Sequence, residues 1–148
     1  MTSASNNPMA AIELLVQATN AHDLEGIVSC FADDYTLDAP VHPARSFRGK
    51  EQVRRNWMQI LDAVPDISVR VLRSACDHGT VWTEWEMIGT RRDGGAHLMR
   101  GVFIFGVSEG LVRWGRMFLD PVDLFGPDMD SAVHDQLGSG GGAGRARS

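Results

Sequence analysis

The chain has 148 residues, 43% of them hydrophobic, and a formal net charge of -5 at pH 7, which suits a single domain with a substantial core. The acidic balance argues against nucleic acid or an anionic membrane as the principal partner. No apolar run approaches the roughly 20 residues that span a bilayer. The first residues, MTSASNNP, lack the basic and apolar regions of a secretory signal, so we expect a cytoplasmic protein.

The first part of the chain has the apolar spacing of two amphipathic helices. Pro8 suits a first helical turn, and the apolar residues after it predict a helix over about Pro8–Asn20. Asp23 can cap a second helix, because its side chain can accept a hydrogen bond from a free backbone N–H of the first turn. The apolar face of this second helix is predicted to contain Leu24, Ile27, Val28 and Phe31.

A short strand and a third helix are expected next. Tyr35–Ala39 is typical of a strand, and Pro40–Gly49 is typical of a loop. A third helix is then indicated by apolar residues at helical spacing, and Pro65 ends it. Those apolar residues are Val53, Trp57, Ile60, Leu61 and Val64.

From Ile67 onward the apolar period changes to two, which predicts β-strands. Glycine-containing turns at Arg92–Gly95 and Ser108–Gly110 favour antiparallel hairpins. Because helices and strands are segregated along the chain, we predict an α+β fold in which three N-terminal helices pack in a strongly curved antiparallel sheet. The strands after Ile67 are expected at Val81–Arg91, His97–Val107 and Leu111–Leu119.

The end of the chain has a different composition. We expect one domain over residues 8–122 and an irregular, partly disordered tail over residues 123–148. The final segment, GSGGGAGRARS, is rich in glycine and serine, which bury too little surface to order themselves.

Several segments together resemble the nuclear transport factor 2-like superfamily, which includes SnoaL-like cyclases, ketosteroid isomerases and limonene epoxide hydrolases. The resemblance rests on NAHDLEGIVSCFADD from Asn20, the strand Tyr35–Ala39, the helix start at Gly49 and the terminal LVRWGRMFLDP. It implies a cone of three helices wrapped by a bent sheet, usually dimeric. It does not imply one activity, because one fold can host many.

The positions that carry catalysis in these relatives hold unreactive residues here. By resemblance, the general base and the two oxyanion donors of a ketosteroid isomerase correspond to Ala39, Leu15 and Gly101. The arginine and the two aspartates of a limonene epoxide hydrolase correspond to Trp85, Met87 and Met117, and the aspartate of SnoaL-like cyclases also corresponds to Met117. The chemistry of either enzyme is therefore not expected in its usual form.

The resemblance implies that Trp85 faces the helices, and strand alternation then predicts which other side chains share that face, because successive side chains point to opposite faces of a sheet. The inward set is apolar and aromatic, which favours a cavity for a small apolar ligand; simple core filling is the alternative. The expected ligand-binding residues are Leu15, Leu37, Ala39, Trp57, Trp85, Met87, Gly101, Phe103 and Met117. No metal-ligand spacing and no nucleotide-binding motif is found in the sequence, so we expect neither a metal nor another cofactor.

The outward set mixes tryptophan and phenylalanine with charged residues, including Trp82, Trp114 and Phe118. Large apolar side chains on a broad sheet face favour a homodimer through that face, and a solvated face is the alternative. Carboxylates opposite arginines on neighbouring strands would pair with one another there.

A one-residue slip in register would exchange the two faces and bring ionisable groups into the cavity. The candidate catalytic residues on the strands are then Glu84, Glu86 and Arg116. Asp120 at the end of the last strand and His42 in the loop after the first strand are further candidates in either register. The sequence therefore favours a cofactor-free protein that binds a small, largely apolar molecule, such as a terpenoid, a steroid or a polyketide-like compound. A SnoaL-like cyclase, isomerase or epoxide hydrolase with non-standard acid and base residues is the alternative.

Overall fold

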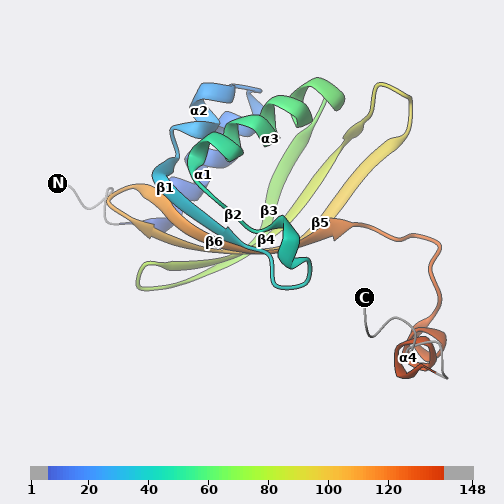
Figure 1. Ribbon diagram of the computed structural model, residues 1–148. Helices are drawn as coiled ribbons and strands as arrows, with labels where there is room; N and C mark the ends of the chain where they lie inside the picture. Colours follow the sequence, from blue (N-terminus) through green and yellow to red (C-terminus); the bar gives the residue numbers. More distant parts are fainter. Residues whose placement is uncertain (1–6, 139–148) are drawn as a thin grey trace.

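The structure is a computed structural model that describes residues 7–138, and three N-terminal helices cover one face of a six-stranded sheet in it (Figure 1). This arrangement confirms the predicted α+β class. A single 3-10 turn, Pro43–Arg45, lies in the loop after the first strand. The helices and strands are α1 (Pro8–Asn20), α2 (Leu24–Val28), β1 (Phe31–Asp38), β2 (Phe47–Arg48), α3 (Lys50–Ala63), β3 (Ser68–Asp77), β4 (Thr80–Thr90), β5 (Ala96–Ser108), β6 (Leu111–Pro121) and α4 (Met129–Leu137).

The strands lie in the order β2-β1-β6-β5-β4-β3. All neighbouring pairs are antiparallel except β1 and β6, which run parallel. The sheet bends strongly around the helices, so its inner face is concave (Figure 1). A two-residue turn, Glu109–Gly110, joins β5 to β6. Both residues have positive φ, of 54° and 77°, as the tight turns of antiparallel hairpins require. No helix among residues 7–138 is long and apolar enough to cross a membrane.

The first two helices begin where the sequence predicts, because side chains cap them. The Asn7 side chain accepts a hydrogen bond from the Met9 N–H at 3.1 Å, and the Asp23 side chain accepts one from the Gly26 N–H at 3.0 Å. The prediction that Phe31 belongs to the second helix is wrong, since α2 ends at Val28. Phe31 instead begins β1 and pairs with β6, so contact with a distant strand outweighs the local helical spacing.

The end of the described chain is more ordered than predicted. Residues 129–137, which we expected to be irregular, form helix α4. The Asp128 side chain caps this helix at the Ser131 N–H, and Gly138 ends it with a left-handed φ of 80°. Figure 1 shows α4 away from the sheet, and none of its residues is buried. Residues 139–148 lie outside the described residues, so the predicted disorder of that segment stays a prediction.

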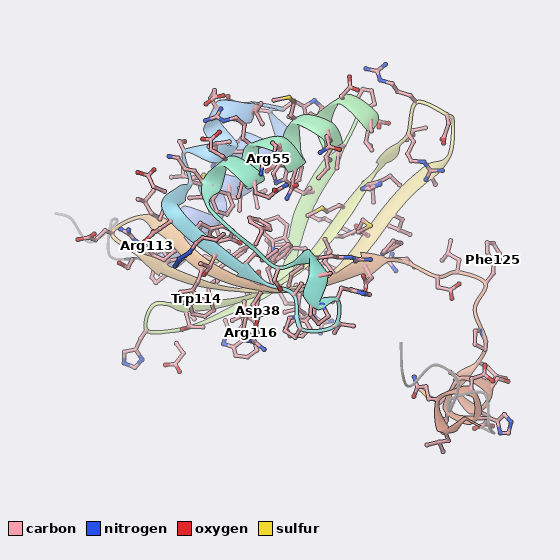
Figure 2. The ribbon with its side chains drawn as sticks, in the orientation of Figure 1. Asp38, Arg55, Arg113, Trp114, Arg116 and Phe125 are labelled. Atoms are coloured by element: carbon pink, nitrogen blue, oxygen red, sulfur yellow. The ribbon has the colours of Figure 1, made fainter. Side chains whose placement is uncertain are left out.

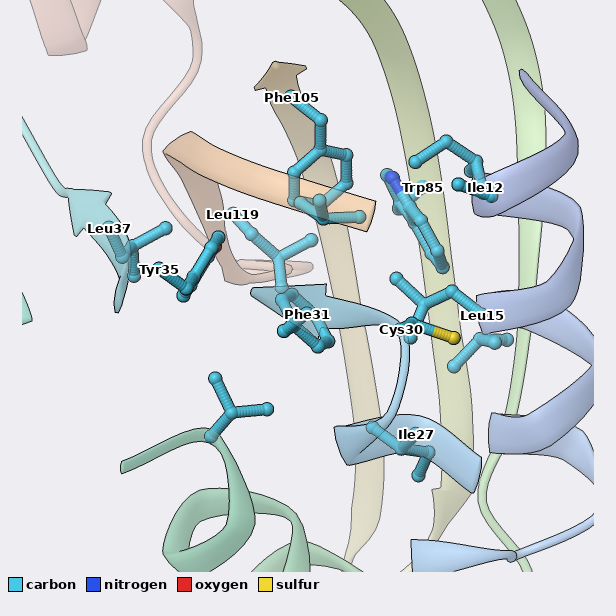
Figure 3. Packing of buried hydrophobic residues seen from close by; sticks show 14 of the residues in the cluster. Ile12, Leu15, Ile27, Cys30, Phe31, Tyr35, Leu37, Trp85, Phe105 and Leu119 are labelled. Atoms are coloured by element: carbon cyan, nitrogen blue, oxygen red, sulfur yellow. The ribbon is translucent and has the colours of Figure 1, made fainter. Parts of the chain in front are cut away.

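The core lies between the helices and the concave face of the sheet (Figure 3). Ile12 from α1 and Ile27 from α2 are fully buried there, and they pack with inward residues of β1, β4, β5 and β6. The Asn20 side chain ties the end of α1 to edge strand β3 by donating to the Val69 carbonyl at 2.9 Å and accepting from the Val69 N–H at 2.8 Å. Helices and sheet are thus held together around a common interior.

Candidate ligand cavity

The interior of the cone contains a cavity of about 250 Å³ between helices α1 and α3 and the concave face of the sheet. Its wall is mainly apolar and aromatic. The lining residues are Leu15, Thr19, Phe31, Tyr35, Leu37, Arg45, Phe47, Val53, Asn56, Trp57, Ile60, Trp85, Met87, His97, Met99, Phe103, Phe105, Met117 and Leu119.

Seven of the nine residues that the sequence suggested for ligand contact lie on this wall: Leu15, Leu37, Trp57, Trp85, Met87, Phe103 and Met117. Ala39 and Gly101 are not among the lining residues. Ala39 is buried directly after the end of β1, and its N–H donates a hydrogen bond to the Ser46 hydroxyl at 3.0 Å. Gly101 faces β6 so closely that a Cβ there would overlap the Phe118 carbonyl. Neither position offers a side chain to the cavity.

One side of the cavity is built from aromatic rings held in fixed positions. The Phe103 and Phe105 rings stack with centroids 5.1 Å apart, and Trp85 meets Phe103 edge-on at 6.0 Å. The Trp85 indole N–H donates to the Thr83 hydroxyl at 2.7 Å, and that hydroxyl donates to the Phe103 carbonyl at 2.7 Å. These bonds satisfy the polar atoms behind the wall, so the ring surfaces face the cavity.

Several lining residues were not among the expected ligand contacts, although the periodicity contained signals for them. Phe105 was expected on the inward face with Phe103, Met99 shares that strand face, and Val53, Asn56 and Ile60 share the helix face of Trp57. The inward position of Tyr35 follows from that of Leu37, two residues later on β1. For Arg45, in the loop after β1, no periodic pattern existed that could have indicated its place.

Tyr35 is the most enclosed polar residue missed, with 2% of its surface exposed. Its ring meets Phe31 edge-on at 4.7 Å and Phe47 at 6.0 Å. Its hydroxyl forms no hydrogen bond with a described residue, and its oxygen is not fully enclosed. Burial of the side chain raises the pKa of Tyr35 well above the usual range. Strand β6 leaves room for the hydroxyl at Gly115, where a Cβ would lie only 2.6 Å from the phenol oxygen.

The remaining polar lining residues belong to the less enclosed part of the cavity. Asn56 accepts a hydrogen bond from the Gln52 side chain at 2.8 Å, and Arg45 lies 3.4 Å from the Asp120 carboxylate. His97 is partly buried; burial, and secondarily the charge of Arg91, lower its pKa. No Asp or Glu is among the described residues that line the cavity.

The candidate catalytic residues on the strands face the opposite side of the sheet. Glu86 pairs with Arg70 at 2.9 Å and with Arg100 at 3.1 Å, and Glu84 lies 3.6 Å from Arg73. Hydrogen bonds from Arg70 and then Arg100 lower the pKa of Glu86. The alternative register that would turn these glutamates inward is therefore wrong, since Trp85 and Met87 hold the inward positions on β4.

Arg116 also faces outward, where its guanidinium donates to the Asp38 carboxylate at 2.7 Å and lies 6.0 Å from the Phe118 ring centroid. Figure 2 shows Arg116, Asp38 and Trp114 together on the side of the sheet away from the helices. Large apolar groups are exposed on the same face: Trp82 is 49% exposed, Ile88 46% and Trp114 36%. We call Trp82, Ile88 and Trp114 the outer apolar patch.

The last two candidates, His42 and Asp120, meet beside the cavity. His42 Nε2 lies 3.0 Å from one Asp120 carboxylate oxygen and 3.3 Å from the other. Both side chains are partly exposed, and neither is among the lining residues. Arg45, which does line the cavity, contacts the same carboxylate. This small cluster is therefore connected to the cavity through Arg45.

No metal-binding group is apparent among residues 7–138, in which no three His, Cys, Asp or Glu side chains gather suitably for an ion. The two cysteines are separate free thiols, Cys30 buried and Cys76 exposed. Burial raises the pKa of Cys30, which makes its thiolate form less accessible.

Solved structures with the same fold include enzymes and a ligand complex. An LEH-like epoxide hydrolase from Mycobacterium tuberculosis has a TM-score of 0.65 and 18% identity, over 76% of this chain and 82% of that chain. A second M. tuberculosis protein, solved in complex with estradiol-17beta-hemisuccinate, has a TM-score of 0.65 and 21% identity, over 79% and 95%. SalBIII, an epoxide hydrolase/cyclase-like enzyme in pyran ring formation in the polyether salinomycin, has a TM-score of 0.67 and 17% identity, over 76% and 90%.

At these identities the structures establish a shared fold and not a shared activity. A comparison with curated proteins finds no significant match. The model of the SnoaL-like domain family matches residues 12–114, which contain most of α1, all of α2 and α3, and most of the sheet. The chain therefore belongs to the SnoaL-like domain family.

Proposed function

We propose that the protein binds a small, largely apolar organic molecule in the cavity between the helices and the sheet. The observation that carries this proposal is the composition of the wall, which is aromatic and aliphatic and contains no carboxylate among its described residues. The apolar surface of a ligand would leave water on entry, at roughly 25 cal/mol for each Å² that is buried. The stacked rings of Phe103 and Phe105 would offer it a flat contact surface.

The volume limits the size of the ligand. Cavities that hold small molecules are typically about 300–1,000 Å³, so about 250 Å³ lies just below that range. We therefore expect a compact molecule with one or two rings, such as a monoterpenoid or a small polyketide-like bicycle, in preference to a four-ring steroid. The neighbour solved with estradiol-17beta-hemisuccinate supports ligand binding in this fold, and its ligand need not be the one used here.

The four tryptophans of the chain provide a direct test. Trp57 and Trp85 line the cavity, whereas Trp82 and Trp114 lie on the outer face of the sheet. We expect monoterpenoids and bicyclic hydrocarbons to raise the melting temperature, because binding to the native state raises apparent stability. Trp57→Phe should weaken binding several-fold by calorimetry, and the matched control Trp82→Phe should leave it unchanged. Failure of every compound in such a panel to bind would remove the proposal.

A second candidate function, acid–base catalysis at the edge of the cavity, is favoured by one contact. The His42–Asp120 pair could move a proton to or from a ligand, with Arg45 steadying a developing negative charge on oxygen. This would be an epoxide hydrolase or cyclase with non-standard residues, since the usual strand positions hold Trp85, Met87 and Met117.

Hydrolysis of limonene oxide distinguishes this enzyme from a binding protein. The enzyme hypothesis expects turnover that His42→Gln and Asp120→Asn each abolish and that Glu84→Gln retains, because Glu84 lies on the outer face. A binding protein shows no turnover in any of the four proteins, although it still binds the hydrocarbon panel.

We also propose that a second copy of the chain covers the outer apolar patch. Trp82, Ile88 and Trp114 are large apolar side chains that are exposed on this one face. Arginine–carboxylate pairs lie among them, including Glu86 with Arg70 and Arg100, and such pairs would suit the polar part of an interface.

A further inference from the structure

Among the buried residues that line the cavity, the hydroxyl of Tyr35 has no hydrogen-bond partner in the described part of the chain. Three buried lining residues carry a side-chain polar atom: Thr19, Tyr35 and Trp85. The Thr19 hydroxyl donates to the Leu15 carbonyl at 2.7 Å, and the Trp85 indole N–H donates to Thr83. The Tyr35 hydroxyl donates no such bond to a described residue, and its oxygen is not fully enclosed, because no fully buried side-chain polar atom among the described residues lacks a partner. A hydroxyl on a cavity wall that keeps some accessible surface can still donate its proton to a ligand.

The surroundings hold this hydroxyl in one place. Phe31 and Phe47 contact the phenol ring on two sides, and the backbone carbonyl of Tyr35 accepts a hydrogen bond from the Gly49 N–H. The hydroxyl reaches over Gly115, where any larger residue would displace it. The group is therefore positioned before a ligand arrives, which reduces the entropy lost on binding.

We infer that the Tyr35 hydroxyl donates a hydrogen bond to an oxygen of the bound molecule, so that the ligand is an uncharged one- or two-ring compound bearing a carbonyl group. This inference rests on the proposed ligand-binding function and adds the chemical class of the ligand. A carbonyl is favoured because it accepts a hydrogen bond without bringing a charge into an apolar site. The raised pKa of the phenol agrees with this role, since the group keeps its proton.

A pair of probes isolates the oxygen. 1-Tetralone and tetralin share a bicyclic skeleton, and only 1-tetralone has the carbonyl group. Their dissociation constants would be measured by calorimetry for the wild-type protein and for Tyr35→Phe, which removes only the hydroxyl. We expect Tyr35→Phe to weaken 1-tetralone about three- to tenfold, the range of one net hydrogen bond, and to change tetralin less than about twofold.

A spectroscopic measurement provides a second readout, because Tyr35 is the only tyrosine in the chain. Protein labelled with ¹³C at tyrosine Cζ gives one resonance, which 1-tetralone should shift further than tetralin does. The inference requires both results. If both compounds bind and Tyr35→Phe affects them equally, or if the two shifts are equal, the hydroxyl is not the anchor and the binding function still stands. If neither compound nor the wider panel binds, the binding function and the anchor are both wrong.

Discussion

The hydroxyl groups of Thr83 and Tyr35 both lie in the interior, but they differ in the hydrogen bonds that they contribute to the fold. Thr83 both donates and accepts a hydrogen bond behind the cavity wall, and it is 1% exposed. The Tyr35 side chain is 2% exposed, and its hydroxyl has no described partner, but its oxygen is not fully enclosed. The Thr83 hydroxyl therefore contributes two hydrogen bonds to the fold, whereas the Tyr35 hydroxyl contributes none to a described residue.

Substitution of each hydroxyl should therefore change stability in opposite directions. Thr83→Val would leave the Trp85 indole N–H and the Phe103 carbonyl without this partner, which we expect to lower the free energy of unfolding by about 1–3 kcal/mol. Tyr35→Phe should leave it unchanged or raise it by up to about 1 kcal/mol in the absence of ligand. Urea unfolding of the three proteins measures both. A loss of about 2 kcal/mol in Tyr35→Phe would show that the phenol has a stabilising partner after all.

The prediction from sequence was strongest where a side chain belongs to a periodic series. The resemblance indicated inward positions for Trp85, Met87 and Met117, and alternation then gave Phe103 the same face, because the pleat of a strand fixes alternate directions. Gly101 has the same parity, but a glycine cannot line a wall. Arg45 could not be placed, because its loop has no repeating geometry. The unbonded state of the Tyr35 hydroxyl depends on Gly115, 80 residues further along the chain, and no local pattern contains that contact.

Strand β4 separates two environments along a single element. Its inward residues meet the cavity, while Glu86 on the outward side lies between Arg70 of β3 and Arg100 of β5. The register places each arginine directly opposite the glutamate. This cross-strand arrangement connects three strands on the outer face.

Glu86 should make stability depend on pH in acid. Hydrogen bonds from Arg70 and Arg100 lower its pKa in the folded protein below the ordinary value of 4.5. Its stabilising contribution is therefore present above the ordinary pKa and is lost as the pH falls through the folded pKa. We expect the free energy of unfolding of the wild type to fall more steeply than that of Glu86→Gln between about pH 5 and about pH 3.

Urea unfolding at a series of pH values measures this difference, and the other carboxylates cancel because both proteins contain them. Glu84→Gln is the matched control for loss of a negative charge on the same strand and face, since its carboxylate lies 3.6 Å from a single arginine. Parallel pH curves for the wild type and Glu86→Gln would contradict the expected role of the two arginines.

The sequence predicted the type of most helices and strands better than it predicted where each one begins and ends. Phe31 continues the helical spacing of α2 yet belongs to β1, because β6 is available to pair with it. Helix α4 was missed for the opposite reason: its signals are local, but a region with prolines and no core-facing residues was interpreted as irregular. Asp128 and Gly138, which cap the helix, were the signals that could have identified it.

The whole molecule has two distinct apolar surfaces, one enclosed and one exposed. The cavity is inside the cone, whereas Trp82, Ile88 and Trp114 are on its outer face. The proposed ligand would occupy the first, and the proposed second copy of the chain would cover the second. Homodimerisation would bury the patch without affecting access from the helix side of the sheet.

The assembly state can therefore be changed without changing the cavity. We expect the wild type to sediment as a dimer and Trp82→Glu as a monomer, because a charge in an apolar interface is costly. Leu14→Glu is the matched control, since Leu14 is an exposed apolar residue on α1, and it should remain dimeric. Sedimentation velocity at protein concentrations of about 10–100 μM would detect even a dimer with a dissociation constant in the micromolar range. A wild-type monomer throughout that range would contradict the proposed homodimer.

The parallel pairing of β1 with β6 determines when the molecule can be completed during synthesis. The Asp38 and Arg116 partners are 78 positions apart, and β6 lies between β1 and β5 in the sheet. Until the ribosome has released β6, β1 and β2 have no neighbour that joins them to β5, β4 and β3. A nascent chain would thus hold two incomplete half-sheets with exposed edges, and its interior could close only after β6 has left the ribosome.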